Sequence, residues 1–136
     1  ILFFFLSQED LNHDQFCLIG WHMKIIANGG FTPVKSQGTF FAVAECSEAL
    51  QKLIRRKIVN PELMVPESQG GNLEDNLDWQ MTKWIAQHAK VTCLPMSAFT
   101  SEQYKEPWNL LRFSFCVSDE AFAKSSKGMK EIKCLL

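Results

Sequence analysis

Runs of consecutive apolar residues in this chain predict three buried strands. Residues 39–44 and 110–117 are rich in β-branched and aromatic side chains, and residues 91–94 form a shorter run that stops at Pro95. The continuous apolar character of 39–44 is typical of a strand buried on both faces. Residues 31–34 precede it across a glycine-containing turn, so the two segments are expected to pair as a hairpin.

Short polar side chains mark the starts of four expected helices, because they can accept hydrogen bonds from the free amides of a first turn. The expected starts are Ser7, Ser47, Asp78 and Asp119. Gly20 is expected to end the first helix, and Asn60-Pro61 to break the second. Residues 60–77 contain prolines, a glycine pair and several polar residues, which indicates a long loop.

The predicted elements form a recognisable order after the N-terminal segment. That order is strand, strand, helix, loop, helix, strand, loop, strand, helix, and the turn signal Asn28-Gly29-Gly30 precedes it. It predicts an α+β fold, in which helices cover one face of a small mixed or antiparallel sheet.

The composition is that of one globular domain, with 136 residues of which 46% are hydrophobic and 21% are charged. A net charge of −1 argues against nucleic-acid binding, which depends on clustered cationic surface, and we interpret the basic run at residues 52–57 as a solvated helix face. The apolar residues 1–6 are too few for a membrane span, which needs about 20 residues. Many complete cofactor enzymes need more than one such domain, and the chain does not begin with Met, so we expect it to be part of a longer protein.

The five cysteines and three histidines are scattered along the chain, which argues against a metal site. No two cysteines have the close spacing of a zinc-binding pair, and no His-x-x-x-His accompanies them. We expect reduced, mostly buried thiols. His13, His22 and His88 have no nucleophile near them in the sequence, so no catalytic role is assigned to them.

Arg112 is the most informative candidate, because it lies within an otherwise apolar strand pattern. Period-two alternation places Arg112, Ser114 and Cys116 on one face of the strand and the apolar residues between them on the other. A buried guanidinium needs a partner, and its planar fork matches a carboxylate in two parallel hydrogen bonds. On residue type alone, the favoured explanation is an edge-strand arginine paired with a surface acid, because strand arginines usually face solvent.

Two other segments are candidates for binding residues. Residues 95–99 follow the end of a predicted strand, where loops commonly carry binding groups. In residues 37–41, Gly38 lets the backbone bend or a ligand approach closely before the strand begins. Taken alone, each segment is also explained by a plain turn. The sequence has no glycine-rich phosphate loop and no Gly-x-Ser-x-Gly nucleophile motif.

Taken in order, these segments resemble the C-terminal part of class I/II pyridoxal-phosphate aminotransferases, most of all the kynurenine aminotransferase / glutamine transaminase K / cysteine-conjugate β-lyase group. The similarity covers residues 24–133 and implies a division into a poorly matched segment, 1–27, and a C-terminal small domain of the fold-type I kind, 28–136. The motifs that carry it are Ser36-Gln37-Gly38-Thr39-Phe40-Phe41, Asp78-Trp79, Lys83-Trp84-Ile85, Leu94-Pro95-Met96-Ser97-Ala98-Phe99, Leu111-Arg112-Phe113-Ser114-Phe115 and Asp119-Glu120-Ala121.

The resemblance implies a role for Arg112 and a cofactor for the parent enzyme. Arg112 takes the position of the family arginine that grips the α-carboxylate of both the amino-acid donor and the 2-oxo-acid acceptor. Enzymes of this kind carry pyridoxal phosphate on a lysine of the large domain, which lies upstream of the segments matched here. No lysine of this chain has a matching context, so no cofactor contact is assigned, and the chain alone is expected to be inactive.

The same resemblance implies a homodimeric parent enzyme in the cytoplasm or the mitochondrion, with kynurenine or glutamine as amino donor and β-lyase activity as a further option. Met96 departs from a glycine common in the wider class, which leaves the substrate preference open. Two alternatives also stay open. One is a stand-alone βαβ-type module that binds a ligand or RNA. The other is a non-catalytic remnant that folds without a function or pairs with a full-length subunit.

Overall fold

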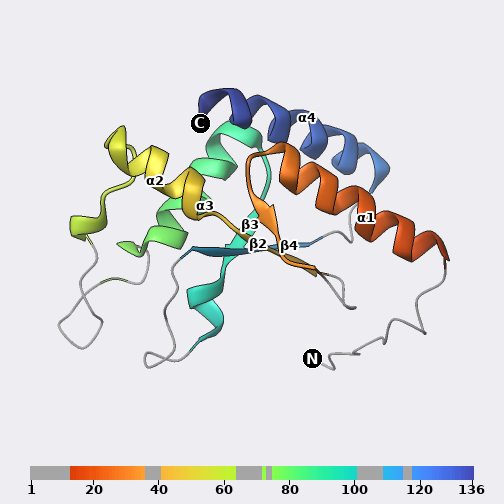
Figure 1. Cartoon of the computed structure of the whole chain (residues 1–136), viewed down its shortest axis with the longest axis horizontal. Helices are drawn as coiled ribbons and strands as arrows, with labels where there is room; N and C mark the ends of the chain where they lie inside the picture. The colour runs from red at the N-terminus through yellow and green to blue at the C-terminus, as the bar shows by residue number, and fades with distance from the viewer. Residues whose placement is uncertain (1–12, 36–40, 64–71, 73–74, 101–108, 115–117) are drawn as a thin grey trace.

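A computed structural model describes residues 13–35, 41–63, 72, 75–100, 109–114 and 118–136 of the chain (Figure 1). Its α-helices are α1 (His13–Asn28), α2 (Ser47–Arg55), α3 (Leu77–Ala89) and α4 (Asp119–Leu135). Its strands are β1 (Thr32–Pro33), β2 (Phe41–Glu45), β3 (Cys93–Pro95) and β4 (Leu110–Ser114). Two short 3-10 helices complete the described elements, η1 (Pro61–Leu63) and η4 (Met96–Phe99).

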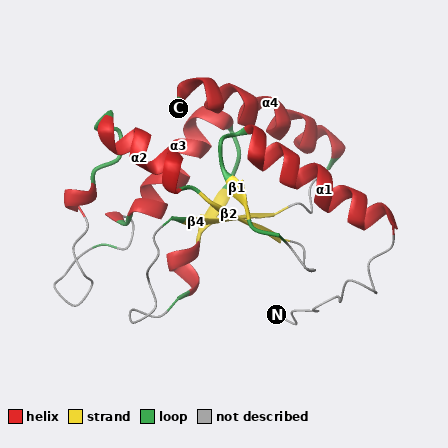
Figure 2. Ribbon diagram, in the orientation of Figure 1, coloured by secondary structure: helices red, strands yellow, loops and turns green. Residues whose placement is uncertain are grey.

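The four strands form one antiparallel sheet in the order β1-β2-β4-β3. The hairpin expected from the sequence is confirmed, since β1 pairs with β2 and Pro33 lies opposite Ala44. The α-helices lie on one side of the sheet (Figure 2). The predicted α+β fold is therefore confirmed, and of the two sheet types expected, the antiparallel one is present.

The core lies between the helices and the inner face of the sheet. Alternate residues of the central strands point into it, with Ala42, Ala44 and Leu111 fully buried. The prediction that the strand at residues 39–44 is buried on both faces was wrong, because Phe41 and Val43 of β2 are only half-buried. Apolar helix residues fill the other side of the core, and they include Ile26, Leu53, Met81, Ile85, Met129 and Ile132.

The first helix runs well past the end that the sequence predicted. Gly20 is exposed in the middle of α1, and the helix ends instead at the Asn28-Gly29-Gly30 turn, where Gly30 has a φ of +87°. A glycine inside a helix costs only about 1 kcal/mol. Burial of Ile25 and Ile26 in the core outweighs that cost. The predicted start at Ser7 lies outside the described residues.

The other helices begin close to the predicted positions, but the capping residues differ. Asp119 is the first residue of α4, and the cap is Ser118, whose hydroxyl accepts a hydrogen bond from the Ala121 amide at 3.3 Å. Ser47 likewise lies inside α2, after Cys46. The second residue of α3 is Asp78, which is buried. None of the described helices is long and apolar enough to cross a membrane.

The burial of the cysteine thiols predicts how they react with an alkylating reagent. Cys46 and Cys93 are buried and unpaired, and burial raises the pKa of each thiol to about 12. Both are therefore protonated at pH 8, whereas Cys134 is exposed. We expect iodoacetamide at pH 8 to alkylate Cys134 in the folded chain, and to reach Cys46 and Cys93 only after unfolding in urea. Peptide mass spectrometry measures this, and labelling of Cys46 as fast as Cys134 in the folded chain would contradict the burial.

Candidate functional site

Arg112 lies in the middle of the central strand β4, where both neighbouring strands hold its backbone. Val43 of β2 is its partner on one side and Leu94 of β3 on the other. The strand alternates as predicted, since Leu111 and Phe113 are buried against the helices and Arg112 projects from the opposite face. A residue in this position has a fixed Cα, so its side chain starts from a rigid base.

Two phenylalanine rings flank the guanidinium of Arg112. Its Cζ atom lies 4.2 Å from the centroid of the Phe41 ring and 3.9 Å from that of Phe99. Phe41 belongs to β2 and Phe99 to η4, which follows β3, so the rings come from the two sides of β4. Contacts of this kind attract the cation to the ring faces.

No acidic side chain of the described residues pairs with Arg112. The ion pairs recorded among those residues all link neighbouring turns of a helix, as Glu48 with Lys52 does. The Nε atom of Arg112 is buried and has no hydrogen-bond partner within the described part of the chain. Within that part, the surface-acid explanation of Arg112 has no support. A bound carboxylate would satisfy Nε and a terminal N–H together.

The segment at residues 95–99 forms η4 rather than a plain loop. The amide of Ser97 donates a hydrogen bond of 2.9 Å to the Oδ2 atom of Asp78. The Oδ1 atom of the same carboxyl group accepts from the Trp79 amide at 3.0 Å. Asp78 therefore joins the first turn of α3 to the short helix that carries Phe99. Burial raises the pKa of the Asp78 carboxyl, and the hydrogen bonds from Ser97 and Trp79 partly offset that effect.

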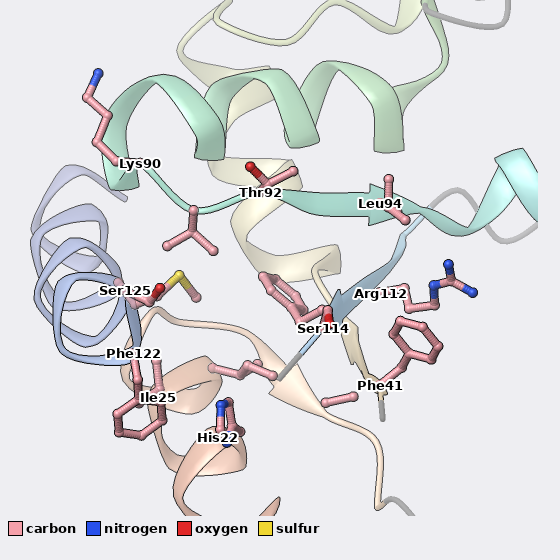
Figure 3. Close-up of a pocket in the computed structure, with 15 residues that line it drawn as sticks. His22, Ile25, Phe41, Lys90, Thr92, Leu94, Arg112, Ser114, Phe122 and Ser125 are labelled. Carbon is pink, nitrogen blue, oxygen red and sulfur yellow. The ribbon is translucent and has the colours of Figure 1, made fainter. Parts of the chain in front are cut away.

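A cavity of about 390 Å³ opens beside the site, at the end of the sheet where β4 finishes. Figure 3 shows Arg112 and Phe41 at one end of it, and His22, Ile25 and Phe122 at the other. Most of the lining is apolar, and His22 packs edge-on against Phe122 with 4.7 Å between the ring centroids. Arg112 and a largely apolar space are thus adjacent.

The described lysines do not fit a pyridoxal-phosphate site. Such a site needs a lysine amine directed into a cavity, with an acidic residue near the ring nitrogen. All described lysines except Lys52 are exposed, and Lys52 pairs with Glu48. Lys90 borders the cavity, but its amine points away from it and donates to the Gln87 carbonyl (Figure 3). Nor do the described residues contain a cluster of three or more potential metal ligands.

The sequence identified Arg112 and the segment around Ser97, but it missed how they are connected. In the sequence, Phe41 and Phe99 are only parts of motifs, and Asp78 is only a helix start and part of a motif. Residues 37–40 of the third candidate segment, 37–41, lie outside the described residues. The signal that could have placed Phe41 near Arg112 is the register of the two strands. Pairing of Phe41 with Ser114 brings the Phe41 ring diagonally next to Arg112.

Comparison with curated proteins relates the chain to transaminases. It is 27% identical over 112 residues to a kynurenine–oxoglutarate transaminase of Dictyostelium discoideum, a match that covers 82% of the chain. Identity to kynurenine–oxoglutarate transaminase 3 is 21% over 79% of the chain for Homo sapiens and 24% over 71% for Mus musculus. The chain spans only 24%, 21% and 18% of the lengths of these relatives. No protein-family model matches it.

Solved structures of aminotransferases share the fold. The crystal structure of a proposed kynurenine aminotransferase from Saccharomyces cerevisiae matches 89% of the chain with a TM-score of 0.64 and 22% identity, over 26% of its own length. An N-succinyldiaminopimelate aminotransferase from Mycobacterium tuberculosis matches 90% of the chain with a TM-score of 0.52 and 20% identity, over 25% of its own length. The chain is a distant homologue of aminotransferases and resembles their C-terminal portion.

Proposed function

We propose that this chain is the substrate-binding part of a pyridoxal-phosphate aminotransferase, and that Arg112 holds the α-carboxylate of its substrates. The observation that carries the proposal is the buried Nε of Arg112, which has no hydrogen-bond partner among the described residues, in a guanidinium that lies between the rings of Phe41 and Phe99. A carboxylate bound there completes the hydrogen bonding of the guanidinium. The distant similarity to transaminases supplies the reaction class.

The chemical contribution of the chain is orientation. Two parallel hydrogen bonds to a carboxylate fix both the position and the rotation of the α-carbon, which a single point charge does not do. Holding a reacting group in place in this way accounts for a large part of enzymatic rate enhancement. The amino acid and the 2-oxo acid both carry this carboxylate, so one arginine serves both halves of a transamination.

We propose further that the amino donor is of the kynurenine or glutamine type and that the cofactor lysine lies in a large domain outside this chain. The parent enzyme would then be a homodimer in the cytoplasm or the mitochondrion, and the chain alone would be inactive. The cavity beside Arg112 has room for an apolar side chain, which suits an aromatic donor. An added cysteine-conjugate β-lyase activity rests on the family resemblance alone.

A graft tests this function. The segment of the Dictyostelium transaminase that aligns with this chain over 112 residues is replaced by the matching part of this chain. The resulting chimeric enzyme is assayed with kynurenine and 2-oxoglutarate. We expect measurable transamination, with the unmodified relative as the reference. A graft that is folded and carries pyridoxal phosphate but transfers no amino group from any of several amino acids would contradict the proposal. Salt-sensitive RNA binding by the chain would instead support the stand-alone module.

A further inference from the structure

Asp78 is buried at the first turn of α3, and no step of the proposed carboxylate binding uses it directly. Its side chain is 1% exposed, and its two oxygens have separate partners. Oδ1 accepts from the amide of the next residue, Trp79, and Oδ2 accepts from the Ser97 amide 19 residues further along the chain. Burying a carboxyl group is costly, as the raised pKa of Asp78 also indicates. The second, long-range hydrogen bond is more than a helix start requires.

Ser97 lies two residues before Phe99 in the single turn of η4. The start of η4 is already held, because Pro95 is paired opposite Leu111 in the sheet. The rest of this short helix projects beyond the sheet, and Phe99 is 51% exposed despite its contact with Arg112. A ring so exposed has little packing to hold it, so its position depends on the backbone of η4.

From this arrangement we infer that Asp78 is a positioning residue for Arg112: it fixes η4 through the Ser97 amide, and η4 holds the Phe99 ring against the guanidinium. The inference deepens the proposed carboxylate site and rests on it. Phe41 reaches Arg112 from β2, which the sheet holds rigidly, so Asp78 controls only the Phe99 side. An arginine confined in this way has less rotamer freedom to lose when a carboxylate binds.

Replacement of Asp78 by asparagine is suited to test this. The Trp79 and Ser97 amides donate to different oxygens of Asp78, and an asparagine replaces one of these oxygens by an NH₂ donor, so in this geometry one of the two amides loses its acceptor. Asp78→Ser is a second variant, because a hydroxyl near the helix start is too short to reach the Ser97 amide. Asp75→Asn is the matched control, since it removes one negative charge just before the same helix, and its recorded contact with Gln80 uses only its backbone carbonyl.

The measurement is the Arg112 side-chain resonance in the full 136-residue chain labelled with ¹⁵N-arginine. The chain has three arginines, so the Arg112 Nε–Hε signal is identified as the one lost in Arg112→Gln. The face of a neighbouring ring moves such a signal upfield, and Phe99→Leu is expected to shift it downfield. We expect the Asp78 variants to shift it in the same direction and to a similar extent, and Asp75→Asn to leave it unchanged.

Binding of pyruvate to the same samples links this geometry to function. We expect pyruvate to bind the Asp78 variants roughly twofold to tenfold more weakly, because Arg112 must then be ordered on binding. An unchanged Arg112 signal in folded Asp78 variants would overturn the inference, and so would unfolding of both variants at 25 °C, which would assign Asp78 to stability alone. If the signal moves as expected but pyruvate binds no form of the chain, the positioning by Asp78 stands and the proposed carboxylate site fails.

Discussion

Substitution of Arg112 by glutamine is expected to lower kcat/KM for kynurenine in the grafted transaminase roughly 10²- to 10³-fold. Removing one partner of a partly buried, hydrogen-bonded charge pair costs about 2–5 kcal/mol, and each 1.4 kcal/mol is about a factor of ten. Glutamine keeps a polar side chain of similar reach but loses the charge and the fork. Steady-state kinetics of the graft, with and without the substitution, measure the effect.

Two further variants distinguish the effects of the charge and the planar shape of the Arg112 side chain from a general effect of removing an arginine. Arg112→Lys keeps the positive charge but lacks the planar fork, so we expect an intermediate loss of roughly tenfold. Arg55→Gln removes an exposed arginine of α2 and is expected to leave kcat/KM unchanged. If Arg112→Gln keeps kcat/KM within twofold of the unmodified graft, Arg112 does not hold the carboxylate.

Gly128→Ala is expected to destabilise the chain by about 2–3 kcal/mol, which corresponds to a fall in Tm of roughly 10 °C. Gly128 lies in α4 where it crosses the end of α3, and a Cβ atom there would lie 1.9 Å from the carbonyl oxygen of Ala89. That oxygen belongs to backbone, so it moves only if one of the two helices shifts. Urea unfolding followed by circular dichroism measures the change.

The matched control is the same substitution in another helix. Gly20 is exposed in α1, and a Cβ atom there would meet nothing within 4 Å. Gly20→Ala is therefore expected to stabilise the chain by about 0.5–1 kcal/mol, the usual gain in a helix interior. Equal stabilities of the two variants would show that α3 and α4 do not pack as closely as described.

The strand that carries Arg112 was predictable because the α-helices pack on one face of the sheet. With helices on one side, β4 must bury every second residue, and Leu111 and Phe113 meet that requirement in the sequence itself. The same reasoning overestimated the burial of β2, because Phe41 and Val43 are apolar but lie on the face away from the helices and are only half-buried. A run of apolar residues therefore identifies a strand well, but it does not show whether both faces of that strand are buried.

Helix ends were less predictable, because tertiary packing decides them. Gly20 is a common stop signal, yet α1 continues until its buried residues Ile25 and Ile26 have reached the core. Asp78 has the side chain of a capping residue, but it bonds to a segment that lies 19 residues away. Local patterns cannot reveal such a partner, since the partner is brought near only by the fold.

Arg112 could be singled out from the sequence as a candidate, but the arrangement of side chains around it could not. Arg112 stood out as a charge in an apolar strand, and the resemblance to aminotransferases gave it a role. Its neighbours Phe41 and Phe99 are 71 and 13 residues away in the sequence, and both reach it through pairing of the sheet strands. Only the register of the three strands shows that they meet.

Titration of the Arg112 Nε–Hε resonance with pyruvate tests the central claim most directly, because it observes the proposed anchor itself. Pyruvamide, the neutral amide of the same 2-oxo acid, is the control ligand. We expect pyruvate to shift the Arg112 signal to saturation, pyruvamide to leave it unchanged, and the signals of Arg55 and Arg56 to stay in place. A signal from Arg112 that does not move, or three arginine signals that drift together without saturating, would contradict the assignment of Arg112 as a carboxylate anchor.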